Sequence, residues 1–206
     1  MTQDDFLPIR SFDHVEFYVG SAKQAAHFYD RVFGFKPIAR LGLETGTRDR
    51  ASYVMEQGNI RFVLTSALTP DHEIARHCGL HGDGVKVIAL EVGDVEASIR
   101  EVKARGATIL QPVESTEDAD GVLKTGVIGY AGDTVFKFVE RRNYQGAFAP
   151  GFAPIEAHGT KSVGLAAIDH IVTNVHLGQM DYWAEWFERI MGFTQLTHFT
   201  DEDISP

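Results

Sequence analysis

The chain contains an internal repeat, and this repeat restricts the possible folds more than any other feature of the sequence. Phe12-Asp13-His14-Val15 near the N-terminus has a counterpart in Ile168-Asp169-His170-Ile171. Each stretch opens an apolar run typical of a strand and is followed by an amphipathic helical pattern. Each helical pattern ends at a Gly-Phe pair, Gly34-Phe35 or Gly192-Phe193, and glycine is the usual residue at a helix C-terminus. Such self-similarity indicates a fold built from repeated modules.

The repeated unit consists of one strand, one helix and three further strands. The first unit spans about residues 12–66 and the second about 85–140. We expect helices over 22–33 and 95–103, the latter with Asp94 as N-cap, and strands over 52–56, 59–63, 85–92, 108–110, 122–128 and 134–139. A third unit begins near Ala166, and it predicts a first strand, a helix over Met180 to Ile190 and a second strand over 194–199.

These units predict an α+β fold made of βαβββ modules, with two paired modules and an incomplete third. One module cannot bury its own concave face, whereas two modules side by side form a strongly curved sheet that can. The predicted domains are residues 1–145, a linker over 146–165 and the start of a second domain over 166–206. Since the third unit has no partner module here, we expect its apolar helix face, with Trp183, Trp186 and Phe187, to be poorly covered.

Composition and charge exclude several classes of function. The formal net charge is −10 and no basic stripe is present, which disfavours binding to nucleic acid. No apolar run reaches the roughly 18 residues of a transmembrane helix, so no membrane span is expected. Cys78 is the only cysteine and cannot form an internal disulfide, which fits a reducing compartment and favours a cytoplasmic location.

The repeat places His14 and His170 at equivalent positions, each in the first strand of its unit. A pair of modules could supply two histidines and one carboxylate, a ligand set that suits oxygen activation on Fe(II). The second unit has Val87 where the first has His14, although it ends in the carboxylate Glu140. The first two units therefore offer at most two ligands, and the partners that His170 would need lie in strands that the sequence does not include.

Two other patterns resemble known sites only in part. In the stretch His72-Glu73-Ile74-Ala75-Arg76-His77, the histidines are five residues apart, about 140° around a helix, whereas zinc-protease helices carry them four apart. Gly42-Leu43-Glu44-Thr45-Gly46 lacks the Gly-Lys-Ser/Thr ending of a phosphate-binding loop and is more typical of a turn between strands.

The βαβββ units and the opening histidine resemble the vicinal-oxygen-chelate superfamily of glyoxalases and dioxygenases. Within it, several segments together resemble the 4-hydroxyphenylpyruvate dioxygenases, and the resemblance covers nearly the whole chain from about residue 10. These segments are Phe12-Asp13-His14-Val15-Glu16-Phe17 through Gln24-Ala25-Ala26, Gly42-Leu43-Glu44-Thr45-Gly46, Phe62-Val63-Leu64-Thr65-Ser66-Ala67-Leu68, His81-Gly82-Asp83-Gly84-Val85-Lys86 and Asp169-His170-Ile171-Val172.

The resemblance implies a non-catalytic first domain and a second domain that holds Fe(II) through two histidines and a glutamate. The keto-acid substrate 4-hydroxyphenylpyruvate would chelate the iron, and O₂ would drive its conversion to homogentisate and CO₂. Of the ligands, only His170 maps onto this chain; Val172, two residues on, would line the substrate pocket, and His14 would not be a ligand. The resemblance also implies a homo-oligomer when full length, and a chain of 206 residues without activity on its own, because the iron site is incomplete.

Three alternatives remain open at this stage. A 4-hydroxymandelate synthase resembles the dioxygenases in fold, iron and substrate but hydroxylates the side chain. A non-enzymatic binding module built on a degenerate barrel would also fit the incomplete ligand set. A complete two-module lyase or dioxygenase over residues 12–140 is disfavoured by Val87 in place of a histidine.

Overall fold

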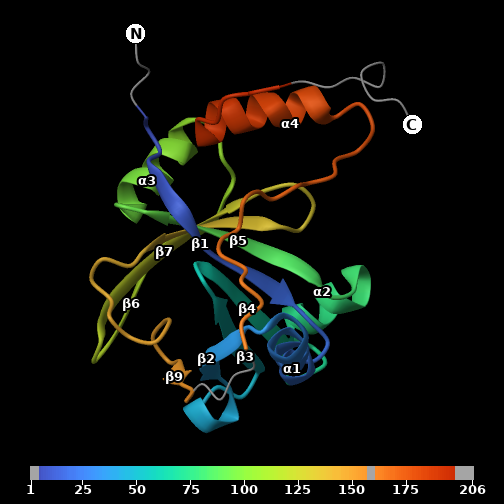
Figure 1. Ribbon diagram of the computed structural model, residues 1–206. Helices are drawn as coiled ribbons and strands as arrows, with labels where there is room; N and C mark the ends of the chain where they lie inside the picture. Colours follow the sequence, from blue (N-terminus) through green and yellow to red (C-terminus); the bar gives the residue numbers. More distant parts are fainter. Residues whose placement is uncertain (1–4, 157–160, 198–206) are drawn as a thin grey trace.

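The computed structural model describes residues 5–156 and 161–197, and one mixed nine-stranded sheet organises them (Figure 1). The strands are β1 (Ile9–Tyr18), β2 (Lys36–Leu41), β3 (Arg50–Gln57), β4 (Ile60–Ala67), β5 (Gly84–Val92), β6 (Ile109–Asp118), β7 (Gly121–Gly129), β8 (Val135–Glu140) and β9 (Ala153–Pro154). The helices are α1 (Ala22–Phe33), α2 (Glu73–His81), α3 (Val95–Ala104) and α4 (Met180–Trp186), and a π-helical turn over Phe187–Met191 continues α4.

The sheet order β6-β7-β8-β5-β1-β4-β3-β2-β9 shows the two predicted modules directly. In each module the first strand pairs in parallel with the last, β1 with β4 and β5 with β8, and the remaining strands follow antiparallel. The modules meet where β1 and β5 pair antiparallel, with Val15 opposite Ile88. The prediction of an α+β fold with two paired βαβββ modules is therefore confirmed.

Local sequence signals position the two module helices. Ser21 caps α1 by accepting a hydrogen bond from the backbone N–H of Gln24, and Gly34 ends this helix in the left-handed region at φ 70°. The Asp94 side chain accepts a hydrogen bond from the backbone N–H of Ala97, as expected for the predicted N-cap of α3. Both helices bury their apolar faces against the sheet.

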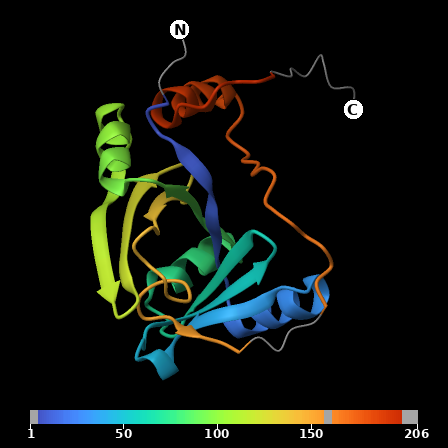
Figure 2. The same cartoon turned by 60° about the vertical axis from the view of Figure 1, so that its left-hand side comes forward.

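The opposite, inner face of the sheet is covered by the chain that follows β8. Phe148 is buried there with Ala39, Val54 and Val63. In Figure 2 this segment runs inside the curve of the sheet before β9 pairs with β2 at the sheet edge. The first part of the predicted linker is thus packed against the first domain rather than exposed.

Gln57 fixes the next part of the connection. Its side-chain oxygen accepts hydrogen bonds from the Ser162 hydroxyl at 2.7 Å and from three consecutive backbone N–H groups, each at 3.1 Å, of Val163, Gly164 and Leu165. Gly58, at φ 58°, lies so close that a Cβ there would be 2.6 Å from the carbonyl oxygen of Ala166. Glycine is therefore required where the β3–β4 turn meets this segment.

The third unit agrees with prediction only in its helix. Residues 161–176 form no strand, nor do residues 194–197, so both predicted strands are wrong over the described residues; residues 198 and 199 lie outside them. A strand needs a neighbouring strand to satisfy its backbone hydrogen bonds. None of the described strands pairs with either stretch.

The helix of the third unit is nevertheless covered. Trp186, Ile190 and Met191 are buried in the same cluster as Phe136 of β8 and residues of α3, and Trp183 and Phe187 pack against this cluster. The expectation that this apolar face would be left uncovered is wrong, because the outer face of the second module supplies the packing surface (Figure 1). No helix among the described residues is long and apolar enough to cross a membrane.

Candidate functional site

The first Asp-His pair lies on β1 at the centre of the sheet. His14 Nδ1 is 2.5 Å from Asp13 Oδ1, and both side chains are almost completely buried. Arg141, just after β8, donates from Nη2 to Asp13 Oδ1 at 2.8 Å and from Nε to Oδ2. The carboxylate is therefore held by a forked guanidinium and an imidazole together, and Arg141 also donates to the backbone carbonyl of Phe148.

The surroundings set the charge states of this buried pair. Burial alone would raise the pKa of Asp13, but the hydrogen bonds from His14 and Arg141 outweigh burial and hold that pKa far below its usual range. Burial lowers the pKa of His14, and the bond to Asp13 offsets this only in part. We conclude that Asp13 is ionised and paired with Arg141, while His14 is a neutral partner.

Among the described residues, no group of three metal-binding side chains includes His14. Its ring packs edge-on against Phe148, with centroids 5.1 Å apart. Glu140 is buried, but one of its oxygens accepts from the backbone N–H of Val95 at the start of α3 at 3.1 Å and the other accepts from Arg142 at 2.7 Å. Glu140 therefore caps a helix, and the structure does not bring it together with His14.

The second Asp-His pair repeats the local geometry in a different environment. His170 Nδ1 is 2.7 Å from Asp169 Oδ2, but the two side chains are 72% and 94% exposed. This bond leaves Nε2 of His170 available to a ligand, in the arrangement by which carboxylates orient metal-binding histidines. Within the described residues, no group of three metal-binding side chains includes His170.

His170 borders an open cavity of about 520 Å³ between the outer face of the sheet and α4. Its walls include Phe12, Leu90, Phe136 and Phe187, so they are largely apolar. Val172 is 76% exposed and is not among the residues lining this cavity. Residues 168–173 do not form a strand, so Val172 and His170 do not share a strand face.

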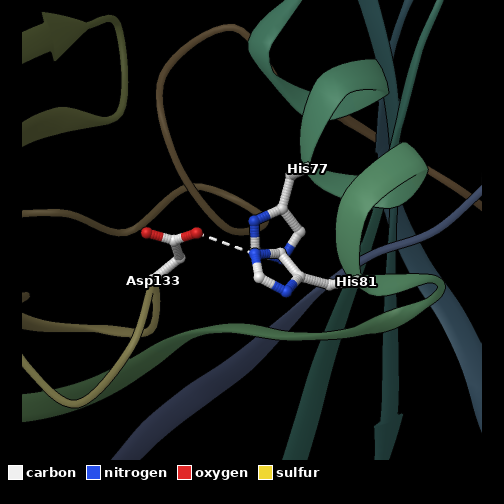
Figure 3. Close-up of side chains that lie close together, drawn as sticks. All are labelled: His77, His81 and Asp133. Atoms are coloured by element: carbon white, nitrogen blue, oxygen red, sulfur yellow. Dashed lines mark hydrogen bonds and ion pairs between the residues drawn. The ribbon is translucent and has the colours of Figure 1, made fainter.

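One cluster of potential ligands was missed at the sequence level. His77 and His81 on α2 meet Asp133 in the β7–β8 turn, and their ligand atoms all lie within 4.8 Å of one another (Figure 3). The available signal was the four-residue spacing of His77 and His81, which places both rings on one helix face.

A family model gives the first comparison with known proteins. The model of the "Glyoxalase/Bleomycin resistance protein/Dioxygenase superfamily" matches residues 11–125, which is more than half of the chain. The match begins within β1 and ends within β7, so it covers the first module and most of the second.

Curated relatives match over a longer stretch. The chain is 42% identical to the 4-hydroxyphenylpyruvate dioxygenase of Caenorhabditis elegans over 200 residues, which is 94% of this chain and 51% of the relative. It is 38% identical to that of Yarrowia lipolytica, covering 95% of this chain and 52% of the relative. The chain thus spans about half the length of the curated relatives it matches.

Solved structures share the fold. A triple mutant of 4-hydroxymandelate synthase from Streptomyces coelicolor superposes with a TM-score of 0.76 at 26% identity, over 90% of this chain and 53% of that chain. The methylmalonyl-CoA epimerase of Mycobacterium tuberculosis superposes with a TM-score of 0.54 at 18% identity, over 68% of this chain and 92% of that chain. The epimerase likeness shows the fold alone.

Proposed function

Because the chain belongs to the glyoxalase/bleomycin resistance protein/dioxygenase superfamily, we propose that it supplies the N-terminal half of an Fe(II)-dependent 4-hydroxyphenylpyruvate dioxygenase. The whole protein would convert 4-hydroxyphenylpyruvate and O₂ into homogentisate and CO₂, a step of tyrosine catabolism. The observation that carries this proposal is an identity of 37–42% with curated dioxygenases, and two of these matches cover 97% of the chain. This identity extends far beyond residue 125, where the superfamily match ends.

In this proposal His170 is one of the iron ligands. Its support is the Asp169–His170 hydrogen bond, which fixes the imidazole tautomer and leaves Nε2 free for a metal. The exposure of the ring also allows further ligands to approach it. His14, which has the same place in the first module, would have a structural role, because its ring is buried against Phe148 and its Nδ1 bonds to Asp13.

The described residues fit Fe(II) only in part. A non-haem Fe(II) site of an oxygenase needs two histidines and a carboxylate, and His170 supplies a single imidazole. Asp169 is already hydrogen-bonded to that ring, and no other described residue completes a group of three around it. The other ligands would have to come from the remaining half of the whole protein, and no reaction step is assigned to the residues described here.

The family resemblance also supports Val172 as a proposed residue of the substrate pocket. Residues 168–173 would have to join a sheet for its side chain to share a face with His170. The proposal also includes a cytoplasmic location and a homo-oligomer of the full-length protein. The support for the cytoplasm is the single cysteine, Cys78, which forms no disulfide.

Oxygen uptake with 4-hydroxyphenylpyruvate and added Fe(II) tests the function. The protein for this test is the present chain joined to the C-terminal half of the C. elegans relative, with the 206-residue chain alone run beside it. We expect the joined protein to consume O₂ and to release homogentisate, and the chain alone to be inactive.

A matched pair of variants tests the ligand assignment in the joined protein. His170→Ala should abolish both iron retention and turnover, because it removes one of three ligands. His176→Ala changes an exposed histidine of the same segment and should preserve both. Turnover with retained iron in His170→Ala would refute the assignment.

The second candidate function is that of a 4-hydroxymandelate synthase. The solved synthase of S. coelicolor favours it, because that structure superposes over 90% of the chain. Product identification in the same assay separates the two functions, since hydroxymandelate in place of homogentisate would establish the synthase.

A further inference from the structure

The strongest unassigned feature lies on the surface where α2 meets the β7–β8 turn. His77 and His81 project from the last turn of α2 toward Asp133, as Figure 3 shows. Their ring centroids are 4.5 Å apart, and His81 Nε2 lies 2.7 Å from Asp133 Oδ2. The three side chains thus converge on one point from two segments that are distant in the sequence.

The chemistry of the three groups suits a transition-metal ion. A metal binds the neutral form of imidazole and the ionised form of a carboxylate. Burial, together with the nearby Lys86 and His81, lowers the pKa of His77, and the bond from His81 lowers the pKa of Asp133. The three side chains offer two imidazole nitrogens and one carboxylate oxygen, whose ligand atoms all lie within 4.8 Å of one another.

We propose that His77, His81 and Asp133 bind one divalent transition-metal ion, and that this ion is Zn²⁺. Two imidazoles and one carboxylate are common Zn²⁺ ligands, at donor distances of about 2.0–2.2 Å. Zn²⁺ also ranks above Fe²⁺ in affinity for nitrogen and oxygen donors. Water would take the remaining position, since the His81 and Asp133 side chains are 40% and 57% exposed.

Little movement is needed to admit the ion. A tetrahedral site separates neighbouring donors by about 3.4 Å. His81 Nε2 and Asp133 Oδ2 are closer than this now, because a proton joins them; the metal would replace that proton. Both side chains are exposed enough to rotate apart by the required distance, since neither is locked in the core.

A bound ion would link helix α2, in the connection between the two modules, to the last hairpin of the second module. Helix α2 lies in the connection between β4 and β5 and buries only Ile74, so apolar packing holds it weakly. Asp133 belongs to the last hairpin of the second module, 52 residues after His81. Among the described residues, Lys86 opposes metal binding, because its ammonium group donates to the Asp133 backbone carbonyl and adds positive charge near the ion. The site lies apart from the iron proposal, since it does not use His170.

Zn²⁺ titration of the metal-free 206-residue chain tests the proposal. Isothermal calorimetry and metal analysis after dialysis should give one Zn²⁺ per chain bound through these residues, and Zn²⁺ should raise the midpoint of thermal unfolding. His77→Ala and Asp133→Asn should each weaken binding by at least about tenfold. Asp133→Asn retains an acceptor for His81, so it separates loss of a ligand from loss of a hydrogen bond. Fe²⁺, added anaerobically, should bind more weakly than Zn²⁺.

Two controls make the result decisive. His27→Ala removes an exposed histidine from α1 and should leave Zn²⁺ binding unchanged. His170→Ala shows whether the ion is held at the other histidine instead. The proposal is overturned if the wild-type chain binds no Zn²⁺, if His77→Ala binds it as tightly as wild type, or if only His170→Ala loses it. Circular dichroism of each variant confirms that the fold is kept.

Discussion

Replacing Asp13 by asparagine tests the buried ion pair that joins β1 of the first module to Arg141, just after the last strand of the second module. The substitution keeps the shape of the side chain and removes its charge. Asparagine can accept one hydrogen bond from Arg141, but its amide NH₂ would then face a second donor of the guanidinium or of His14. Arg141 would be left without a counter-ion in a position where only 18% of its side chain reaches solvent.

The structure allows the cost to be estimated. Breaking a buried ion pair by removing one partner costs about 3–5 kcal/mol of unfolding free energy. The contacts of Arg141 with the carbonyl oxygen and the ring of Phe148, the latter at 4.9 Å, remain in the variant. The lower end, about 3 kcal/mol, is therefore expected. For a chain of this size it corresponds to a fall in Tm of about 6–12 °C.

The same pair predicts how stability depends on pH. The pKa of Asp13 is lower in the folded chain than the value of about 3.9 for an unfolded aspartate. The pair therefore contributes fully above that value and is lost as the pH falls below it. Urea unfolding at pH 7 should show the full difference between wild type and Asp13→Asn, and the difference should shrink from about pH 4 downward.

Asp49→Asn is the matched control, because the Asp49 side chain is half exposed and pairs with Arg50 and His72 rather than with a buried guanidinium. Exposed pairs contribute less than about 1 kcal/mol, so this variant should resemble wild type. A loss of less than about 1 kcal/mol in Asp13→Asn would refute the reasoning, since it would mean that Arg141 is stable without its counter-ion.

Two further predictions concern packing. Gln57→Leu should free residues 162–165, so that the amides of Val163 and Leu165 exchange hydrogen at least about tenfold faster. Hydrogen exchange in the core strands should not change. Unchanged exchange at Val163 and Leu165 would show that Gln57 does not hold the segment. Gly126→Ala should cost about 1–3 kcal/mol in urea unfolding, because its Cβ would lie 2.6 Å from a carbon of the Ile99 side chain. Gly129→Ala, whose Cβ would meet nothing closer than 3.6 Å, is its control and should show a smaller loss.

The two complete modules could be predicted because local signals and packing agree there. Helix α1 was predicted with its observed bounds, and its predicted cap Gly34 ends it in the left-handed region. The N-cap Ser21 and the buried Ala22 and Ala26 are features that the structure adds. For strand β6 only the start, at 108–110, was predicted, and the strand runs from Ile109 to Asp118. Its outer part is polar and exposed, so no apolar pattern reveals it; the ladder to β7 holds it.

The third unit shows where local pattern stops being sufficient. Residues 168–171 match residues 12–15 of β1 in sequence, but β1 is a strand because β4 and β5 flank it on both sides. No described strand flanks residues 168–171. A helix satisfies its own backbone hydrogen bonds, which explains why α4 forms as predicted and the strands beside it do not. Its face is covered by the second module, a contact that the repeat itself does not encode.

The candidate sites also differ in whether local sequence or a tertiary contact reveals them. Both Asp-His pairs could be identified from the sequence, because each consists of adjacent residues at the same position of the repeat. It missed the approach of Asp133 to His77 and His81, because this approach depends on how the β7–β8 turn lies against α2. The sequence marks Asp133 as a turn residue, but it does not reveal which side chains the Asp133 carboxylate contacts.

The two Asp-His pairs show how one dipeptide can serve two purposes. In both, the carboxylate bonds to Nδ1 of the following histidine, at 2.5 Å in one and 2.7 Å in the other. At Asp13 a guanidinium 128 residues away also takes the carboxylate, and Phe148 covers the ring, so the pair stabilises the fold. At Asp169 no described cation pairs with the carboxylate and the ring is open, so the same bond can orient His170 toward a metal. The difference between the two pairs therefore lies in Arg141 and Phe148, which follow β8, and not in the repeated dipeptide.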